Sequence, residues 1–316
     1  MTKFLRKRSC LVVLLGVGIV LFLSSLIEIL WLHFNAGNSE SYQSFNGQRA
    51  YGDVVYQVGL GPRVPLTQAH HTVIQWIKDE LIKSGWEVQL QSGNFEGKPI
   101  TNIIATRSEF AEDSLPWVIL GAHYDTRLQS DQDVDPNNRQ TPVPGANDGA
   151  SGVAVLLELA RSLPKKLPIN LWLVFFDAED NGELGNWDWI MGSRYFINQI
   201  SGRPDAVVIV DMVGDSDLNI YREGNSSIQL GDQIWNVAES LGYKSKFIPE
   251  VNHYILDDHV PFIDQGIPAV DIIDIDYPFW HTQADTLDKI SASSLQIVGE
   301  TVYKWLVDGP SLPIIQ

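Results

Sequence analysis

Five clusters of hard, metal-binding side chains stand at predicted strand ends or loops, far apart along this chain. They contain, in order, His123 with Asp125, Asp148, Glu179 with Asp180, Asp211, and His281. Charged groups are costly near a core unless they are paired or bound to a metal, so their repetition is informative where one alone is not. Imidazoles and carboxylates are zinc ligands, and a further carboxylate beside the ion can move protons. The pattern therefore predicts a zinc site with an adjacent catalytic carboxylate.

Between the clusters, strand-like apolar runs alternate with helix-like segments. Strands are expected at 87–91, 102–106, 117–121, 169–176, 206–210 and 269–273, and helices at 66–84, 152–163, 229–241 and 291–306. This alternation predicts an α/β fold, a single-domain α/β/α sandwich with a central mixed, mostly parallel sheet. Ligands of such sheets gather beyond the carboxyl ends of the strands, which is where the clusters fall.

The composition excludes several classes of function. The chain has 316 residues and a formal charge of −17, which disfavours nucleic acid as a partner because phosphate binding needs a basic face. The acidity fits simple solubility, or an attraction for peptides with a cationic amino end. Cys10 is the only cysteine and lies in an N-terminal apolar run, so the domain has no disulfide and no thiolate ligand. Any zinc must therefore be held by His, Asp and Glu.

The apolar run at 10–32 is interrupted by one acidic residue, Glu28. Its length is close to the roughly 20 residues that cross a bilayer as a helix. The basic tip, 1–9, is expected in the cytoplasm, which makes the catalytic domain extracytoplasmic. We favour a transmembrane signal anchor over a cleaved signal peptide and secretion, because no clear small-x-small site follows the run directly. Polar residues 33–50 are interpreted as a linker, which leaves 51–310 as the catalytic domain.

Each cluster also has a simpler interpretation. Asp125 can accept the free ring N–H of His123 and orient the ring toward a metal, or the two can merely close a turn. Asp148 precedes a predicted helix and could cap it, although a cap does not explain the small residues around it. Asp211 alone could be a turn aspartate, and a histidine beside a tryptophan, such as His281, is more often structural.

Glu179 and Asp180 form the most informative pair, directly after an apolar run. Adjacent residues point in different directions, so Asp180 can bind the metal while Glu179 faces the substrate as general base or acid. An acidic strand end that is exposed to solvent is the alternative.

With these motifs in hand, residues 51–306 resemble metallopeptidase family twenty-eight, the zinc aminopeptidases, and their relatives the glutaminyl-peptide cyclotransferases. The resemblance implies a zinc exopeptidase-like fold and a zinc ion bound by Asp148, Asp180 and His281, with Glu179 as the catalytic residue. In the dinuclear aminopeptidases it implies a second zinc at His123 and Asp211. The chain departs from the family at Asp180, where glutamate is usual, and the shorter side chain needs a closer backbone.

The motifs are divided between the two branches. Residues 145–152 resemble the aminopeptidases, whereas 101–104, the inserted segment 181–191, 257–262 and 280–282 resemble the cyclotransferases. A cyclotransferase needs one zinc to polarise a side-chain amide, which the substrate's own amine attacks. Asp257 and Asp211 would then support Glu179 through hydrogen bonds. The expected enclosure for the substrate side chain is aromatic, with ordinary core packing as the alternative, and consists of Trp187, Phe279 and Trp280.

We therefore predict a zinc-dependent glutaminyl-peptide cyclotransferase that converts N-terminal Gln of peptides to pyroglutamate with release of ammonia. The alternative is a zinc aminopeptidase of the same fold with two zinc ions. A catalytically silent binding ectodomain is less favoured, because the set of predicted ligands and Glu179 is intact. The expected partners are peptide or protein N-termini and, through the N-terminal helix, a membrane.

Overall fold

The computed structural model describes residues 44–312. The basic tip, the predicted membrane segment 10–32 and the first part of the linker lie outside the described residues. Across 44–312, no helix has both the length and the apolar character needed to span a bilayer.

The folded unit begins earlier than the predicted domain boundary at residue 51. Phe45 is buried in the core, and helix α2 (Gly47–Gly59) starts directly after Asn46, whose side chain accepts the backbone N–H of Arg49. The end of the predicted linker is therefore structured. Its polar residues are helix-capping and first-turn residues, which composition alone cannot distinguish from a tether.

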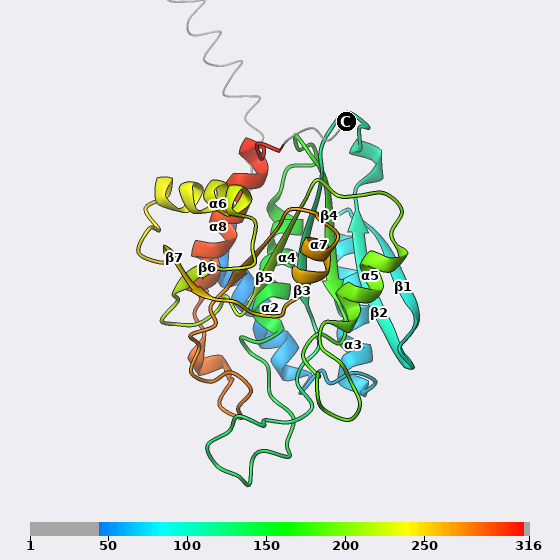
Figure 1. Cartoon of the computed structure of the whole chain (residues 1–316), viewed down its shortest axis with the longest axis vertical. Coiled ribbons are helices and arrows are strands. Elements are labelled where there is room, and N and C mark those ends of the chain that lie inside the picture. The colour runs from blue at the N-terminus through cyan, green and yellow to red at the C-terminus, as the bar shows by residue number, and fades with distance from the viewer. Residues whose placement is uncertain (1–43, 313–316) are drawn as a thin grey trace, which may run out of the picture. The chain divides into compact units, whose positions relative to one another are not determined.

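Six strands form the central mixed sheet, in the order β1-β2-β4-β3-β5-β8 (Figure 1). They are β1 (Glu87–Phe95), β2 (Lys98–Thr106), β3 (Trp117–His123), β4 (Asn170–Phe176), β5 (Ala206–Asp211) and β8 (Ala269–Ile273). Strands β4, β3, β5 and β8 are parallel, whereas β1 and β2 form an antiparallel hairpin that pairs with β4. The predicted mixed, mostly parallel sheet is confirmed.

Helices cover both faces of this sheet (Figure 1). One face carries α2, α3 (Gln68–Lys83), α4 (Ala150–Ser162) and α8 (Ala292–Asp308), and α6 (Ile228–Ser240) packs against α8. The other face carries α5 (Met191–Gln199) and α7 (Val260–Asp264). The short parallel strands β6 (Ile220–Glu223) and β7 (Phe247–His253) lie beside β8, and η1 (Ser108–Phe110) and η2 (Leu287–Lys289) are single turns.

Strand β3 shows why the polar clusters lie at strand ends. Val118 and Leu120 pack into the core under α2 and α4, while Ile119 packs into the second core under α5 and α7. Because successive side chains point to opposite faces, a central strand that is buried on both sides must be apolar throughout. A histidine is therefore accommodated only at its last residue, His123.

All the helices and strands expected from the sequence are present, although β1 extends beyond the expected 87–91 and β2 begins before the expected 102–106. The structure adds α5, α7, β6 and β7, which are short, and α2, a helix as long as α4 that begins within the predicted linker.

Candidate metal centre and active site

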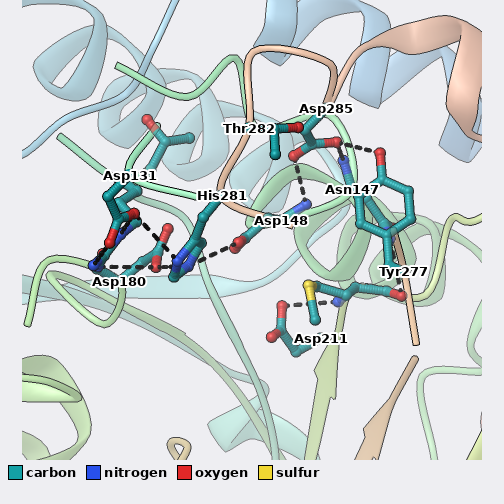
Figure 2. Close-up of polar contacts among 12 residues, drawn as sticks. Asp131, Asn147, Asp148, Asp180, Asp211, Tyr277, His281, Thr282 and Asp285 are labelled. Atoms are coloured by element: carbon teal, nitrogen blue, oxygen red, sulfur yellow. Dashed lines mark hydrogen bonds and ion pairs between the residues drawn. The ribbon is translucent and has the colours of Figure 1, made fainter. Parts of the chain in front are cut away.

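His281 lies between two aspartates at the carboxyl edge of the sheet (Figure 2). Its Nε2 is 2.8 Å from Asp180 Oδ1 and 3.7 Å from Asp148 Oδ2. A tetrahedral zinc ion with bonds of about 2.1 Å separates its ligand atoms by roughly 3.4 Å, a value that these two distances bracket. Asp148 Oδ2 and Asp180 Oδ2 are buried and have no hydrogen-bond partner among the described residues, which is costly unless a cation lies beside them. The three side chains fit a zinc ion.

His123 joins the same centre from the other side of Asp148. Its Nε2 is 3.2 Å from Asp148 Oδ1 and 3.0 Å from Asp211 Oδ1. Asp211 Oδ1 also accepts the backbone N–H of Met212 at 2.8 Å. This second group shares Asp148 with the first and also offers ligand atoms close enough together to hold an ion, although its His123–Asp211 contact is a hydrogen bond.

The loop that carries Asp148 is held by a carboxylate from a distant part of the sequence (Figure 2). Asp285 accepts the backbone N–H groups of Asn147 at 2.8 Å and Asp148 at 3.2 Å, and the Tyr277 hydroxyl donates to Asp285 at 2.8 Å. Gly149 follows with φ +89°, and a Cβ there would collide with the Asp125 carbonyl, so glycine is required. No side chain caps α4, which excludes the cap interpretation of Asp148.

Arg63 lies behind this loop and was not expected from the sequence. Its fully buried guanidinium donates to the carbonyls of Pro144 and Gly145, each at 2.6 Å. Burial lowers the pKa of Arg63 to about 10, while the carboxylates of Asp285 and Asp148 oppose that effect. The side chain stays cationic at neutral pH and offsets part of the negative charge of the centre.

Asp125 positions the turn that follows β4. Its oxygens accept the backbone N–H of Glu179 at 3.1 Å and the side-chain amide of Asn181 at 3.0 Å. His123 Nδ1 lies 3.4 Å from Asp125, and that nitrogen makes no well-formed hydrogen bond among the described residues. The expected orientation of His123 by Asp125 is thus secondary, because the carboxylate is directed mainly at the turn that carries Glu179.

Glu179 is buried, and burial raises its pKa well above the usual range. The carboxylates of Asp257 and Asp180 raise it further, whereas His123 lowers it. A buried carboxyl group whose pKa is raised in this way is suited to act as a general acid or base.

A cavity of about 430 Å³ opens beside these residues. Its carboxylate wall comprises Asp148, Glu179, Asp180, Asp211 and Asp257, and its apolar wall comprises Trp189, Met212, Ile255, Leu256, Ile273, Ile275 and Trp280. Trp280 stacks on His281 with ring centroids 3.6 Å apart, and Trp189 lies nearly parallel to His281 at 6.2 Å. The cavity is therefore acidic where it meets the candidate zinc ligands and aromatic beside them.

The three aromatic residues expected around the substrate have separate positions. Trp280 lines the cavity, whereas Trp187 packs in the small apolar cluster of Met191, with the Lys98 ammonium 4.6 Å from its ring centroid. Phe279 packs edge-on against Tyr277 instead.

Trp189, from the same inserted segment as Trp187, supplies the second indole of the cavity. The base of this segment is closed by two backbone bonds, from Ile190 to the Glu179 carbonyl at 2.9 Å and from Met191 to the Ala178 carbonyl at 3.1 Å. Which tryptophan faces the cavity depends on this loop geometry, and the sequence carries no signal for it.

Arg127 connects the indole to the metal centre and was also not expected. It donates to the Asp180 carbonyl at 2.8 Å and to both carboxylate oxygens of Asp131, at 2.7 and 2.9 Å. Its guanidinium lies 4.7 Å from the Trp189 ring centroid, within the range of a cation–π interaction. Arg127 thereby fixes the position of Trp189 relative to Asp180.

The comparisons with known proteins agree with this geometry. Residues 102–306 match Peptidase family M28. The glutaminyl-peptide cyclotransferase of Drosophila melanogaster is 27% identical over 279 residues, which cover 76% of this chain and 75% of that protein. The crystal structure of Porphyromonas gingivalis glutaminyl cyclase is similar with a TM-score of 0.78 and 35% identity, over 84% of this chain and 99% of that one.

A zinc-dependent exopeptidase from Parabacteroides distasonis is equally close in structure, with a TM-score of 0.79 and 32% identity over 85% of this chain and 100% of that one. Similar proteins thus include both glutaminyl cyclases and zinc exopeptidases. The chain belongs to peptidase family M28 and is an enzyme with the fold that these proteins share.

Proposed function

We propose that this enzyme is a glutaminyl-peptide cyclotransferase that converts the N-terminal glutamine of peptides to pyroglutamate and releases ammonia. The observation that carries the proposal is the position of Glu179, a buried carboxyl group of raised pKa in the same cavity wall as the three candidate zinc ligands. The indoles of Trp189 and Trp280 line the same cavity, where they would limit the access of water.

The reaction needs one bond to form and one to break. The substrate's α-amine nitrogen bonds to its own side-chain amide carbon, and the bond from that carbon to the amide nitrogen breaks. Zinc bound by Asp148, Asp180 and His281 would polarise the amide oxygen. Glu179 accepts the proton that the α-amine loses and passes it to the departing nitrogen, which leaves as ammonia.

Two further carboxylates surround the amine in this proposal. Asp211 and Asp257 both line the cavity, and the negative charge of Asp257 helps to keep the pKa of Glu179 high. Together they favour a substrate with a cationic or hydrogen-bond-donating amino end. This selection would restrict the enzyme to chain N-termini.

We propose a single zinc ion. The unpartnered buried oxygens, Asp148 Oδ2 and Asp180 Oδ2, both belong to the group around His281. In the other group, Asp211 Oδ1 already accepts a backbone N–H and lies within hydrogen-bond distance of His123. Zinc content per folded chain, measured by plasma mass spectrometry, tests this number.

A zinc aminopeptidase is the second candidate, and one observation favours it. His123, Asp148 and Asp211 offer buried ligand atoms close enough together to hold a second ion. Two ions could orient a water molecule for attack on a peptide bond. Two zinc equivalents per chain would support this candidate.

One experiment separates the two activities. The full chain, purified in detergent with zinc, is offered one peptide that begins with glutamine and another that begins with leucine. Ammonia release with the first peptide otherwise intact supports cyclisation, and release of free leucine supports hydrolysis. A zinc-loaded protein that does neither would refute both candidates and favour a binding ectodomain.

We further propose that residues 10–32 anchor the enzyme in a membrane, with the catalytic domain extracytoplasmic. The support is the apolar sequence of that segment and the basic residues before it. The enzyme should stay with membranes in alkaline carbonate, and added protease should reach its C-terminal domain without lysis of the membrane. A soluble product that lacks the segment would instead indicate signal cleavage.

A further inference from the structure

The turn of the β1–β2 hairpin carries a residue that the turn itself does not favour. Only Glu96 and Gly97 stand between the paired residues Phe95 and Lys98, and both have positive φ, +50° and +82°. A type I′ hairpin turn requires positive φ at both positions, for which asparagine, aspartate and glycine are preferred. Glutamate is a costly choice for left-handed backbone. The departure of Glu96 from this local preference points to a role outside the turn.

Arg194 is the partner of Glu96. It lies on α5, which packs beside β1 and β2 (Figure 1). Its Nη2 is 2.7 Å from Glu96 Oε1, and its Nη1 is 2.9 Å from Asp188 Oδ2. The guanidinium also lies 5.4 Å from the ring centroid of Phe95. One side chain therefore joins the hairpin turn to the inserted segment 181–191.

Asp188 connects this contact to the wall of the active-site cavity. Its other oxygen, Oδ1, accepts the backbone N–H of Trp189 at 2.9 Å, and Trp189 lines the cavity. The indole lies against Gly182, where a Cβ would collide with the ring, and the Arg127 guanidinium is 4.7 Å from its centroid. Trp189 is thus held by Arg127 through its ring and by Arg194 through the backbone next to it.

We propose that Arg194 is a positioning residue that acts through Asp188 to keep Trp189 in the cavity wall, with Glu96 of the hairpin turn as its support. A wall that is already in place binds substrate without first losing the freedom of a loop, so the effect falls on KM more than on kcat. The inference applies to any substrate of this cavity, whether the reaction is cyclisation or hydrolysis.

The exposure of these groups separates a positioning role from a role in stability. The Arg194 side chain is 32% exposed, and those of its partners Glu96 and Asp188 are 44% and 58% exposed. Ion pairs this accessible to water contribute little to the stability of a fold. A purely structural Arg194 should therefore be replaceable with little effect of any kind, whereas a positioning residue should change kinetics at an unchanged melting temperature.

Lys98 provides the matched control. It follows the same turn, but its Nζ donates to the Gly185 carbonyl at 3.0 Å and lies 4.6 Å from the ring centroid of Trp187, which is outside the cavity wall. Lys98→Met removes one cation from the contact between the same hairpin and the same segment, and leaves the contacts of Asp188 in place. It therefore controls for the change in net charge and for loosening of the tip.

Steady-state kinetics on whichever test peptide the wild type turns over give the first test. Arg194→Met should raise KM about three- to tenfold with kcat, zinc content and melting temperature nearly unchanged. Lys98→Met should leave KM within about twofold of the wild type. Glu96→Asn suits the turn better, so the melting temperature should stay or rise while KM still increases. An unchanged KM in Arg194→Met would overturn the proposal.

A double-mutant cycle tests whether Arg194 acts through Trp189. If it does, Arg194→Met combined with Trp189→Ala should have the same KM as Trp189→Ala alone. Independent, multiplying increases in KM would show that Arg194 acts by another route, and would refute the positioning role.

A measurement without substrate keeps this inference separate from the proposed function. The protein is labelled with 5-fluorotryptophan, and the fluorine NMR signals of the two indoles are assigned with Trp187→Phe and Trp189→Phe. Arg194→Met should shift or broaden the Trp189 signal, and Lys98→Met the Trp187 signal only. An undisturbed Trp189 signal in Arg194→Met would refute the positioning role. Absence of turnover in the wild type would refute the proposed function alone.

Discussion

Asp285 accepts the backbone N–H of Asp148 at 3.2 Å, although the two residues are 137 positions apart in the sequence. The contact ties the loop that carries Asp148, one candidate zinc ligand, to the segment directly after His281, a second candidate ligand. In the same way, Asp125 after β3 fixes the turn after β4 that carries Glu179. The centre is therefore assembled by carboxylates that bind backbone amides, in addition to those that would bind the ion.

Asp285→Asn should weaken zinc binding. The introduced NH₂ group can accept no hydrogen bond from the backbone N–H groups of Asn147 and Asp148, so the loop should lose its fixed position. We expect an affinity loss of about 10- to 100-fold, measured by competition with a metal indicator. Tyr277→Phe removes only the phenol that supports Asp285 and should cost less. An unchanged affinity in Asp285→Asn would show that the loop needs no such support.

Glu179→Gln should retain zinc and lose turnover. The amide preserves size but cannot carry the proton between the amine and the leaving nitrogen, so kcat should fall by at least about 100-fold. Metal content and ammonia release, measured on the same sample, separate the two effects. Substantial activity in this variant would mean that another group, such as Asp257, carries the proton.

Trp189 and Trp187 provide a matched pair within one loop. Trp189→Ala removes part of the cavity wall and should lower kcat/KM on the order of tenfold. Trp187 lies outside the cavity wall. Trp187→Ala should therefore lower the free energy of unfolding by about 1–2 kcal/mol with little effect on kcat/KM. The reverse result would show that the loop rearranges when substrate binds.

Stability should fall in acid through Glu223. Its folded-state pKa of about 2 is below the ordinary value of 4.5, so the carboxylate stabilises the fold fully above pH 4.5. This contribution, about 3 kcal/mol, is lost as pH falls from 4.5 toward 2. Urea unfolding across this range should show Glu223→Gln less stable than the wild type at neutral pH and nearly equal to it at the acid end. A constant difference would contradict the assigned pKa.

The sequence predicts the sheet and the candidate ligands because both depend on local patterns. A run such as 117–121 is apolar at every position because the strand is buried on both faces, and the first polar residues after it must lie at the sheet edge. Arg63 and Asp285 leave no such pattern. Each acts on backbone atoms of a distant loop, so its role exists only once the chain has folded.

The inserted segment between Asp180 and α5 shows a further limit. Nothing in its composition distinguishes Trp187 from Trp189, and the choice depends on a loop of several residues with left-handed φ, including Glu183 and Asn186. Local strain of this kind is set by the contacts of the whole loop, not by propensity.

The two backbone bonds that close the base of this segment separate its tip from the acid–base residue. The backbone N–H groups of Ile190 and Met191 donate to the carbonyls of Glu179 and Ala178. Insertions or deletions in the loop between Asp180 and Ile190 therefore need not displace the catalytic carboxyl group. Substrate preference in relatives of this enzyme can therefore diverge by remodelling one loop, while the chemistry at its root stays the same.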